Sequence, residues 1–526
     1  MSLLQQAEGS TFFNRHTLRF VIFTPKSFHM WRSVSFVLKT ILTANTLLFM
    51  PGMAVEAQVK KSPIEAIRQE DIKRDLYRMA DDHFRGREAG TLDELKASAW
   101  LAEEARKAGL EPAGDDGSYF QFFSLIRERV SSRSTIKIGM RSFDLWRDAI
   151  VYEPSFATID APVVFIEDPD TVAEETIKGK VVALQFSGKG INDPRKNIPW
   201  RYAGFVVNAW ARKLGAKGVK AIIFVCDNLA EQAWPRATQY NSRGSYQIEG
   251  SLFQRQQLKD IPIIWLKKEA LDLIQSNARL QAQIVSESFT YPSVNVVAKV
   301  KGSDPALSKE YVLFSGHQDH DGVRNIQPGQ DSILNGADDN ATVSVALLAI
   351  GRAFHQKPAR RSALFVWHGS EERGLFGSTW FADHPTVPRE SIVAVLNGDM
   401  IGANAPDSAA LLGVIPPHRS SSDLVNIALQ ENAKGPKFKL DTAWDKATHP
   451  EGWYFRSDHL PYAKKNIPAL FFSTLPHPLY HTPADEASSI NVEKVTKIAR
   501  WMYTTGFTVA NNQQRPKLEP GFKLER

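Results

Sequence analysis

From residue 293 onward, apolar runs with the character of strands alternate with amphipathic stretches that favour helices. The apolar runs are VNVVAKV, YVLFSG, ALFVWHG, IVAVLNGD and ALFFST, and helices are expected at about 340–356 and 491–505. Continuously apolar strands between such helices are typical of a parallel sheet covered on both faces. We therefore predict an α/β fold in which helices sandwich a mainly parallel mixed sheet.

The segments before this region have a different pattern. Residues 64–80 and 92–109 favour amphipathic helices. Between 135 and 287, the apolar runs PVVFI, KVVALQF, AIIFV and IPIIWL are separated by Gly, Asn and Asp, as strands are. We predict a small β-rich domain at 135–287, inserted into a main domain that is built from 58–134 and 288–526.

Residues 1–57 have the pattern of a signal or targeting segment. Arg32 precedes an apolar stretch at 41–50, and small residues up to Ala57 would suit a signal peptidase. This stretch of ten residues is too short to span a bilayer. We expect export to the periplasm or medium without stable membrane insertion; an uncleaved anchor and a start at Met30 remain alternatives.

The composition narrows the possible classes of protein. The chain has 526 residues, 43% hydrophobic and 23% charged, which is typical of a folded protein with more than one domain. Its formal charge of +6 falls to +3 without residues 1–57, and no basic run with interleaved aromatic residues stands out, which argues against nucleic-acid binding. The single cysteine, Cys226, ends an apolar run and is expected to be buried rather than nucleophilic.

Polar residues that can bind metal follow the expected strands. Functional side chains collect beyond the carboxyl ends of strands in such sheets. Those at the strand ends, or before the 340–356 helix, are His317, Asp319, Asp338, Asp339, Glu371, Glu372, Asp399, Tyr480 and His481. Crowded carboxylates need a positive charge among them, and imidazole with carboxylate suits zinc, with manganese or cobalt as alternatives. Five ligands and a spare glutamate fit two ions that share a carboxylate.

The adjacent glutamates Glu371 and Glu372 indicate hydrolysis. Side chains of neighbouring residues point in different directions, so one glutamate can bind metal while the other faces the bound water. A general base must lie within hydrogen-bond reach of the proton that it takes.

The motifs GADDN, SEERGLFGS, NGDMIG, RSDHLP and LYHTPAD, in this order, resemble the zinc aminopeptidase family that includes bacterial leucyl aminopeptidases, glutamate carboxypeptidase and glutaminyl cyclases. The resemblance covers about 293–505. The stretch DHFRGREAGTLDELKASAWLAEEARKAGLEP is similar to the entry region of exported members, and the segment that contains KGVKAIIFV resembles their protease-associated domain. The resemblance implies a zinc exopeptidase fold.

It also implies two zinc ions per chain. The implied ligands are His317 and Asp399 for one ion, His481 and Glu372 for the other, and Asp339 for both. Three further roles are implied: Glu371 as general base, Asp319 as the residue that orients the ring of His317, and Tyr480 as the group that steadies the oxyanion.

The activity that the resemblance implies is that of an exported aminopeptidase acting on peptides. A carboxypeptidase, a dipeptidase or a single-zinc glutaminyl cyclase remains open, and a non-catalytic protein-binding module is the alternative of another class. The sequence determines neither which substrate side chain is preferred nor the oligomeric state.

The roles of several nearby residues stay open. A register error could exchange His317 for His320 or Asp321, Asp338 could replace Asp339, and the two glutamates could exchange roles. Further residues are interpreted as follows: Asp458 and His459 as cleft or loop residues, His368 as a core histidine, Trp444 and Trp453 as pocket wall or packing, and His449 and His477 without a role.

Overall fold

The structure is a computed structural model that describes residues 62–250, 261–276, 278–324 and 329–524. The predicted targeting segment, residues 1–57, lies outside the described residues. Residues Lys60–Arg526 form one compact unit. No helix within the described ranges is both long and apolar enough to cross a bilayer.

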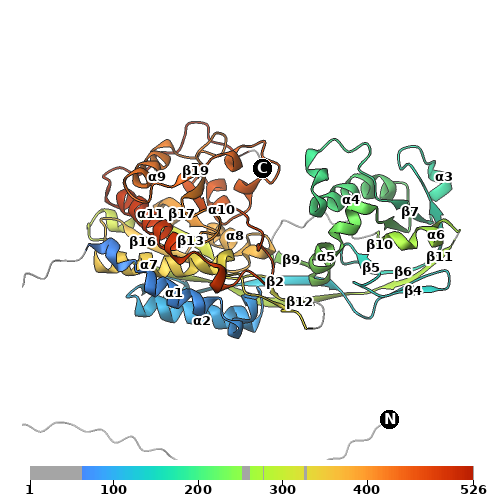
Figure 1. The fold of residues 1–526 in the computed structure, drawn as a ribbon, viewed down its shortest axis with the longest axis horizontal. Coiled ribbons are helices and arrows are strands. Elements are labelled where there is room, and N and C mark those ends of the chain that lie inside the picture. Colours follow the sequence, from blue (N-terminus) through green and yellow to red (C-terminus); the bar gives the residue numbers. More distant parts are fainter. Residues whose placement is uncertain (1–61, 251–260, 277, 325–328, 525–526) are drawn as a thin grey trace, which may run out of the picture. The chain divides into compact units, whose positions relative to one another are not determined.

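The larger sheet has ten strands (Figure 1). They are β1 (Glu111–Pro112), β2 (Phe120–Val130), β9 (Ser245–Ile248), β12 (Ser286–Val300), β13 (Tyr311–His317), β16 (Ser362–His368), β17 (Ile392–Gly398), β18 (Ser408–Leu412), β19 (Lys439–Asp441) and β20 (Ala469–Ser473). The order is β19-β18-β20-β17-β13-β16-β12-β2-β9, with β1 paired to β12.

The prediction of a mainly parallel sheet was wrong for the sheet as a whole. The strands β16, β13, β17 and β20 run parallel, as do β18 and β19. All other pairings are antiparallel. The reason lies in the connections, because the chain leaves along β2 and returns beside it along β12. Only the centre of the sheet has the strand-end geometry that collects functional groups.

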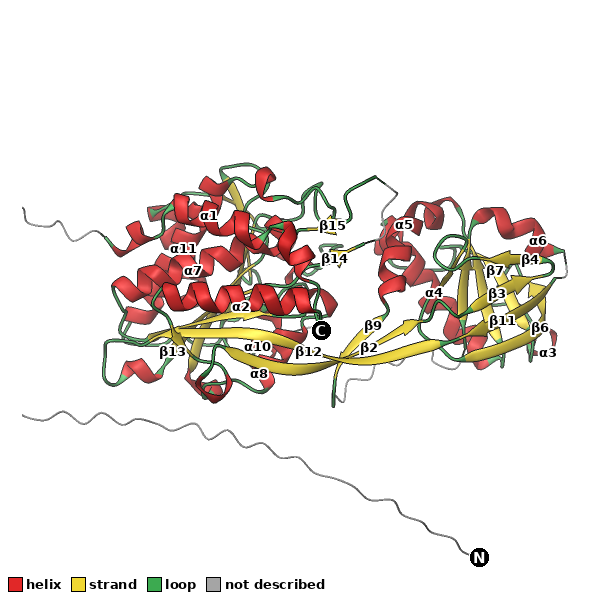
Figure 2. Cartoon of the chain, turned by 90° about the horizontal axis from the view of Figure 1, so that it is seen from below, coloured by secondary structure: helices red, strands yellow, loops and turns green. Residues whose placement is uncertain are grey.

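Helices cover both faces of this sheet (Figure 2). One face carries α1 (Gln69–Met79), α2 (Leu92–Lys107), α7 (Thr342–Gln356), α9 (Ser422–Lys434) and α11 (Val492–Asn511), and the other α8 (Phe376–Asp383) and α10 (His459–Lys464). The strand side chains alternate accordingly, since Phe314 packs in the core on the α7 side and Leu313 in the core on the α8 side. The helix expected at 64–80 begins only at Gln69, because Arg68 has an extended backbone.

A second sheet takes its eight strands from residues 135–284. They are β3 (Thr135–Ile138), β4 (Arg141–Phe143), β5 (Ala149–Val151), β6 (Ala157–Phe165), β7 (Val181–Gln185), β8 (Ala221–Val225), β10 (Ile263–Leu266) and β11 (Arg279–Ile284), in the order β4-β3-β11-β6-β7-β8-β10-β5. Its helices are α3 (Glu174–Ile177), α4 (Pro199–Ala216), α5 (Asn228–Arg243) and α6 (Leu271–Gln275). Cys226 is buried in a core here, as expected. The strand β9, which lies within 135–287, instead pairs with β2 of the larger sheet.

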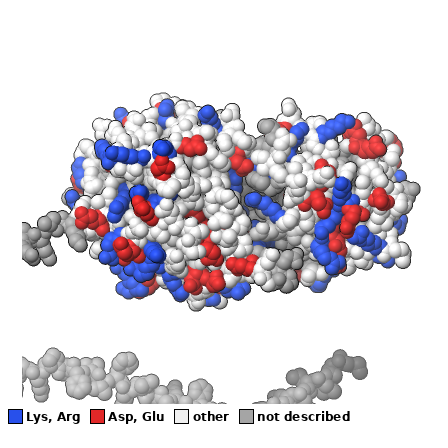
Figure 3. Space-filling model, in the orientation of Figure 1, with Lys and Arg blue, Asp and Glu red and all other residues white. Residues whose placement is uncertain are grey.

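A short hairpin, β14 (Gly322–Val323) and β15 (Ile333–Leu334), follows β13. On the face drawn in Figure 3, basic and acidic side chains are interspersed over the molecule.

Candidate metal centre

The candidate site lies where the parallel strands end. His317 is the last residue of β13, and Asp399 follows β17 directly. Glu371 and Glu372 begin a short turn after β16. Asp339 lies in the turn Ala337–Ala341 before α7, and His481 lies in the loop after β20.

Asp339 lies between the two histidines that the sequence singled out. Its Oδ1 is 3.1 Å from His317 Nε2, and its Oδ2 is 3.1 Å from His481 Nε2. His317 Nε2 is also 3.5 Å from Asp399 Oδ1, and His481 Nε2 is 3.3 Å from Glu372 Oε1. The fold thus brings the five expected ligands together, with one carboxylate in the position to serve two cations.

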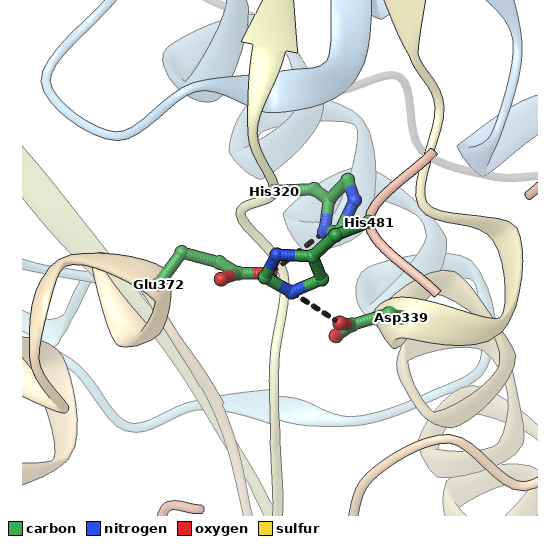
Figure 4. Close-up of side chains that lie close together, drawn as sticks. All are labelled: His320, Asp339, Glu372 and His481. Carbon is green, nitrogen blue, oxygen red and sulfur yellow. Dashed lines mark hydrogen bonds and ion pairs between the residues drawn. The ribbon is translucent and has the colours of Figure 1, made fainter. Parts of the chain in front are cut away.

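The side chains form two groups that could each hold an ion. One consists of His317, Glu371 and Asp399, and the other of His320, Asp339, Glu372 and His481; within each group, the candidate ligand atoms lie within 4.8 Å of one another. Figure 4 shows the second group converging from separate segments. His320 was left open as a register alternative to His317, yet the structure brings both into the site.

Glu371 belongs to the first group and lies beside His317 rather than between the two histidines. Its Oε2 is 3.9 Å from His317 Nε2. Burial raises its pKa well above the ordinary value, and the negative charges of Glu372, Asp399 and Asp458 add to this. A buried carboxylate with a raised pKa is a stronger base than a solvated one, which is the property that a proton acceptor needs.

The electric field of the site favours positive charge. Burial alone would lower the pKa of His481, but the charge of Glu372 and the hydrogen bond to Asp339 raise it to about 10. The pKa of His317 is likewise raised well above its usual value despite burial, by Glu371, Asp399 and Asp339. Two imidazoles that hold protons so tightly occupy a cluster of carboxylates that would also stabilise metal cations.

The hydrogen bonding of the site also fits metal. Neither His317 Nε2 nor Glu372 Oε1 has a hydrogen-bond partner of good geometry, although both are buried. Buried polar atoms are rarely left in this state, because it costs about 1–3 kcal/mol each. An ion bound by imidazole nitrogens and carboxylate oxygens would satisfy them, and this donor set suits zinc.

Asp319 contacts His317 through its main-chain carbonyl oxygen and not through its carboxylate. The main-chain carbonyl oxygen of Asp319 accepts from His317 Nδ1 at 3.1 Å, while its Oδ1 is 3.9 Å away. The Asp319 carboxylate accepts instead from the main-chain amides of Glu371 at 3.0 Å and Glu372 at 3.4 Å. It therefore fixes the turn that carries both glutamates, and the carbonyl leaves His317 Nε2 to face Asp339.

The carboxylate of Asp321 supports the other histidine. Its Oδ2 is 3.4 Å from His481 Nδ1. Its Oδ1 is held by Arg373 at 3.0 Å, by Arg324 at 3.3 Å and by Arg243, the last residue of α5, at 2.5 Å. Such an outer carboxylate fixes which imidazole nitrogen faces the metal.

Asp485 holds the turn that contains Asp339. Its carboxylate accepts from the main-chain amides of Asp338 at 2.9 Å and Asp339 at 3.2 Å. Asp338 itself points away from the two groups, with Oδ1 accepting from Gly402 at 2.6 Å and Oδ2 lying 3.3 Å from His477. Asp338 thus supports the surrounding loops rather than facing the candidate ligands.

A buried acid lies beneath the glutamate turn. Glu94 accepts at 2.6 Å from both the Gly90 amide and Ser293 Oγ, and Ser293 Oγ also contacts Ser370 Oγ at 2.7 Å. A Cβ on Gly369 would lie 2.5 Å from Glu94 Oε1, so only glycine fits there. The sequence did not identify Glu94 as part of the site. Its position in the first turn of α2 does not indicate which residues pack against it.

Tyr480 lies next to the candidate metal centre. Its ring centroid is 3.9 Å from that of His481, and its hydroxyl accepts from Arg456 Nη2 at 3.0 Å. Burial raises the pKa of Tyr480 well above its usual value, so the hydroxyl keeps its proton. The hydroxyl can therefore act as a hydrogen-bond donor.

The other residues considered from the sequence lie outside the two groups. His368 is buried between Asn295 and Tyr462, and burial lowers its pKa to about 3, as a core histidine requires. Burial raises the pKa of Asp458 to about 7 and lowers that of His459 to about 3. The aromatic residues pack together, since the Trp444 ring makes a tilted contact with His449 and an edge contact with Trp453.

The family model "Peptidase family M28" matches residues 295–505. The matching curated proteins include a probable leucine aminopeptidase of Arthroderma benhamiae, 24% identical over 246 residues, which are 45% of this chain and 61% of the relative. Aminopeptidase YwaD of Bacillus subtilis is 21% identical over 49% of this chain and 53% of its own length. The match thus spans only about half to six-tenths of these relatives.

The solved structures of similar fold include two aminopeptidases. The aminopeptidase from Aneurinibacillus sp. strain AM-1 superposes with a TM-score of 0.56 and 17% identity over 87% of this chain and 97% of that chain. BSAP, a zinc aminopeptidase from Bacillus subtilis, has the same TM-score and identity over 85% of this chain and 96% of its own. At such identities the likeness concerns the fold alone.

Proposed function

We propose, on the premise that residues 295–505 form a domain of peptidase family M28, that the chain is an exported aminopeptidase with two zinc ions. In this proposal His317 and Asp399 bind one ion, His481 and Glu372 the other, and Asp339 both. The zinc aminopeptidase among the structures of similar fold supports the choice of metal.

The proposal depends chiefly on the position of Asp339. Its two oxygens each lie 3.1 Å from a different imidazole. One hydrogen-bond partner would be enough for a buried carboxylate. Asp339 instead lies between two imidazoles, and each imidazole has a further carboxylate beside it. In this arrangement Asp339 would serve both ions of a two-metal site.

Zinc, when bound, polarises a carbonyl group and lowers the pKa of water. The chain's own residues then move the proton. Glu371, whose pKa is raised by burial, takes the proton from the attacking water and returns it to the amine that leaves. The Tyr480 hydroxyl donates a hydrogen bond to the oxygen that gains negative charge.

Replacement of the general base tests this mechanism. Glu371→Gln should keep the zinc content of the wild type and reduce kcat for leucine p-nitroanilide by about 10²–10⁴-fold, because the amide cannot accept the proton. Zinc is counted by elemental analysis, and the exposed Glu390→Gln is the matched control. Full turnover by Glu371→Gln would refute the assignment.

A substrate panel separates the possible reactions. Aminoacyl anilides, amino-blocked peptides with a free carboxyl end, dipeptides and a peptide with N-terminal glutamine would each be offered with and without a chelator. Chelator-sensitive cleavage of the aminoacyl substrates is expected. Ammonia release from the glutamine peptide with one bound zinc would favour the cyclase, and no activity in the zinc-loaded protein would favour a binding module.

Export is proposed from the pattern of residues 1–57 alone, and the protease-associated character of 135–287 from its resemblance. In this proposal, a signal peptidase cleaves after Ala57. Edman sequencing of the mature protein from a periplasmic or medium fraction should therefore begin at Gln58. A mature protein that retains residues 1–57 would contradict the proposal.

A further inference from the structure

We propose that His320 is an additional protein ligand of one ion, so that the two ions are held unequally. The ion near Glu372 and His481 would then have four protein ligands, and the ion near His317 and Asp399 would have three, with Asp339 counted in both sites. The inference rests on the proposed function, because it requires bound metal.

The geometry places His320 within the group that also contains Asp339, Glu372 and His481. Its Nδ1 is 2.8 Å from Glu372 Oε1, on the other side of which lies His481 Nε2 at 3.3 Å. The two imidazole rings are nearly perpendicular, with an interplanar angle of 87° and centroids 5.3 Å apart. Figure 4 shows both rings and the carboxylate of Asp339 approaching Glu372 from different directions, as ligands around one point would.

The surroundings of His320 differ from those of the buried His368. The His368 ring nitrogens face Asn295 at 3.3 Å and Tyr462 at 3.1 Å. The His320 side chain is fully buried, yet neither of its ring nitrogens has a hydrogen-bond partner of good geometry. A buried imidazole with this environment needs another partner, which a cation beside Glu372 would provide.

The position of the ring is fixed by its neighbours. A Cβ on Gly336 would lie 2.4 Å from His320 Cγ, so the ring packs directly on that glycine. The buried guanidinium of Arg87 ties together the segments on both sides, because it donates to the carbonyl oxygens of Gln318 at 2.8 Å, Asn335 at 2.7 Å and Gly336 at 3.0 Å. The imidazole is therefore held in place before any ion binds, which favours affinity.

The two sites would differ in what they leave free. Four protein ligands complete the tetrahedral shell that zinc prefers, whereas three leave a position open for water or substrate. The three-ligand site is also the one beside Glu371, whose Oε2 is 3.9 Å from His317 Nε2. The unequal ligand count thus assigns tight binding to one ion and exchange with solvent to the other.

The test is a zinc titration of the metal-free full chain against a chromophoric chelator. Wild type should bind two zinc ions with unequal affinity, and His320→Ala should weaken the tighter site by at least about tenfold, leaving the weaker site unchanged. The exposed His384→Ala is the control and should match the wild type. His320→Asn, which keeps an oxygen near the position of Nδ1, should restore part of the affinity.

His320→Phe separates ligation from packing, because it keeps a ring on Gly336 without a nitrogen. Without metal, His320→Phe should have the same melting temperature as the metal-free wild type. It should still lose the tighter zinc site. Cobalt offers a second readout, since the visible absorption of a four-coordinate cobalt site should weaken in the alanine and phenylalanine variants. Two zinc ions bound with wild-type affinities by these variants would overturn the role of His320 alone. A wild type that binds no zinc would overturn the proposed function as well.

Discussion

Glu94 makes the stability of this protein depend on pH in a direction opposite to that of an ordinary acid. The side chain is fully buried and accepts two hydrogen bonds of 2.6 Å, from Gly90 and Ser293. Burial raises its pKa from 4.5 to about 8, because the hydrogen bonds offset only part of the lost hydration. We predict that Glu94→Gln removes this dependence, since glutamine has the shape of the protonated acid.

The sign follows from proton binding. Between pH 4.5 and about 8, the folded state holds the Glu94 proton and the unfolded state has lost it. The stabilisation is therefore complete below pH 4.5 and is lost as the pH rises through 8. The shift corresponds to about 5 kcal/mol in total, of which about 3 kcal/mol should be lost between pH 5 and pH 8.

The assay is urea unfolding of wild type and Glu94→Gln at several pH values, with a chelator present so that bound metal does not contribute. The difference between the two free energies of unfolding isolates this one group, because the other titrating groups are common to both proteins. The wild type should lose about 3 kcal/mol more than the variant from pH 5 to pH 8. Parallel pH profiles would refute the reasoning, since Glu94 would then be ionised in both states.

Two further predictions concern the metal centre. Tyr480→Phe should lower kcat about 100-fold with unchanged zinc content, because it removes one hydrogen-bond donor to the developing charge; a steady-state assay with wild-type kcat would contradict this. Asp485→Ala should weaken zinc binding about 10–100-fold, because it frees the two amides that hold the turn of Asp339. Unchanged affinities in a calorimetric titration would show that the turn holds without it.

The sequence was sufficient for features that local pattern determines. Continuous apolar runs predicted the central strands, and the polar residues that end them, or that precede the 340–356 helix, were therefore expected to meet at one edge of the sheet. His317, Asp339 and Asp399 do meet there, with His317 Nε2 3.1 Å from Asp339 and 3.5 Å from Asp399. The adjacency of Glu371 and Glu372 likewise needed no tertiary information to suggest two different directions for their side chains.

Strand pairing could not be obtained in the same way. An apolar run buried on both faces does not say which neighbour it pairs with or in which direction, so the antiparallel half of the larger sheet was missed. The helix α5 was also missed, since Pro235 within it argues against a helix in sequence. Tertiary packing decided both.

The supporting groups of the site depend most on the tertiary structure. The carbonyl of Asp319 rather than its carboxylate faces His317, and Arg243, 78 positions before Asp321, helps to hold the acid beside His481. His320 faces Glu372 because Arg87 and Gly336 fix its loop. The sequence by itself determined which chemical groups reach the site, because strand ends are a local property. Which nitrogen or oxygen faces which partner was decided only by contacts between distant segments, because hydrogen-bond geometry depends on positions in space that no local pattern encodes.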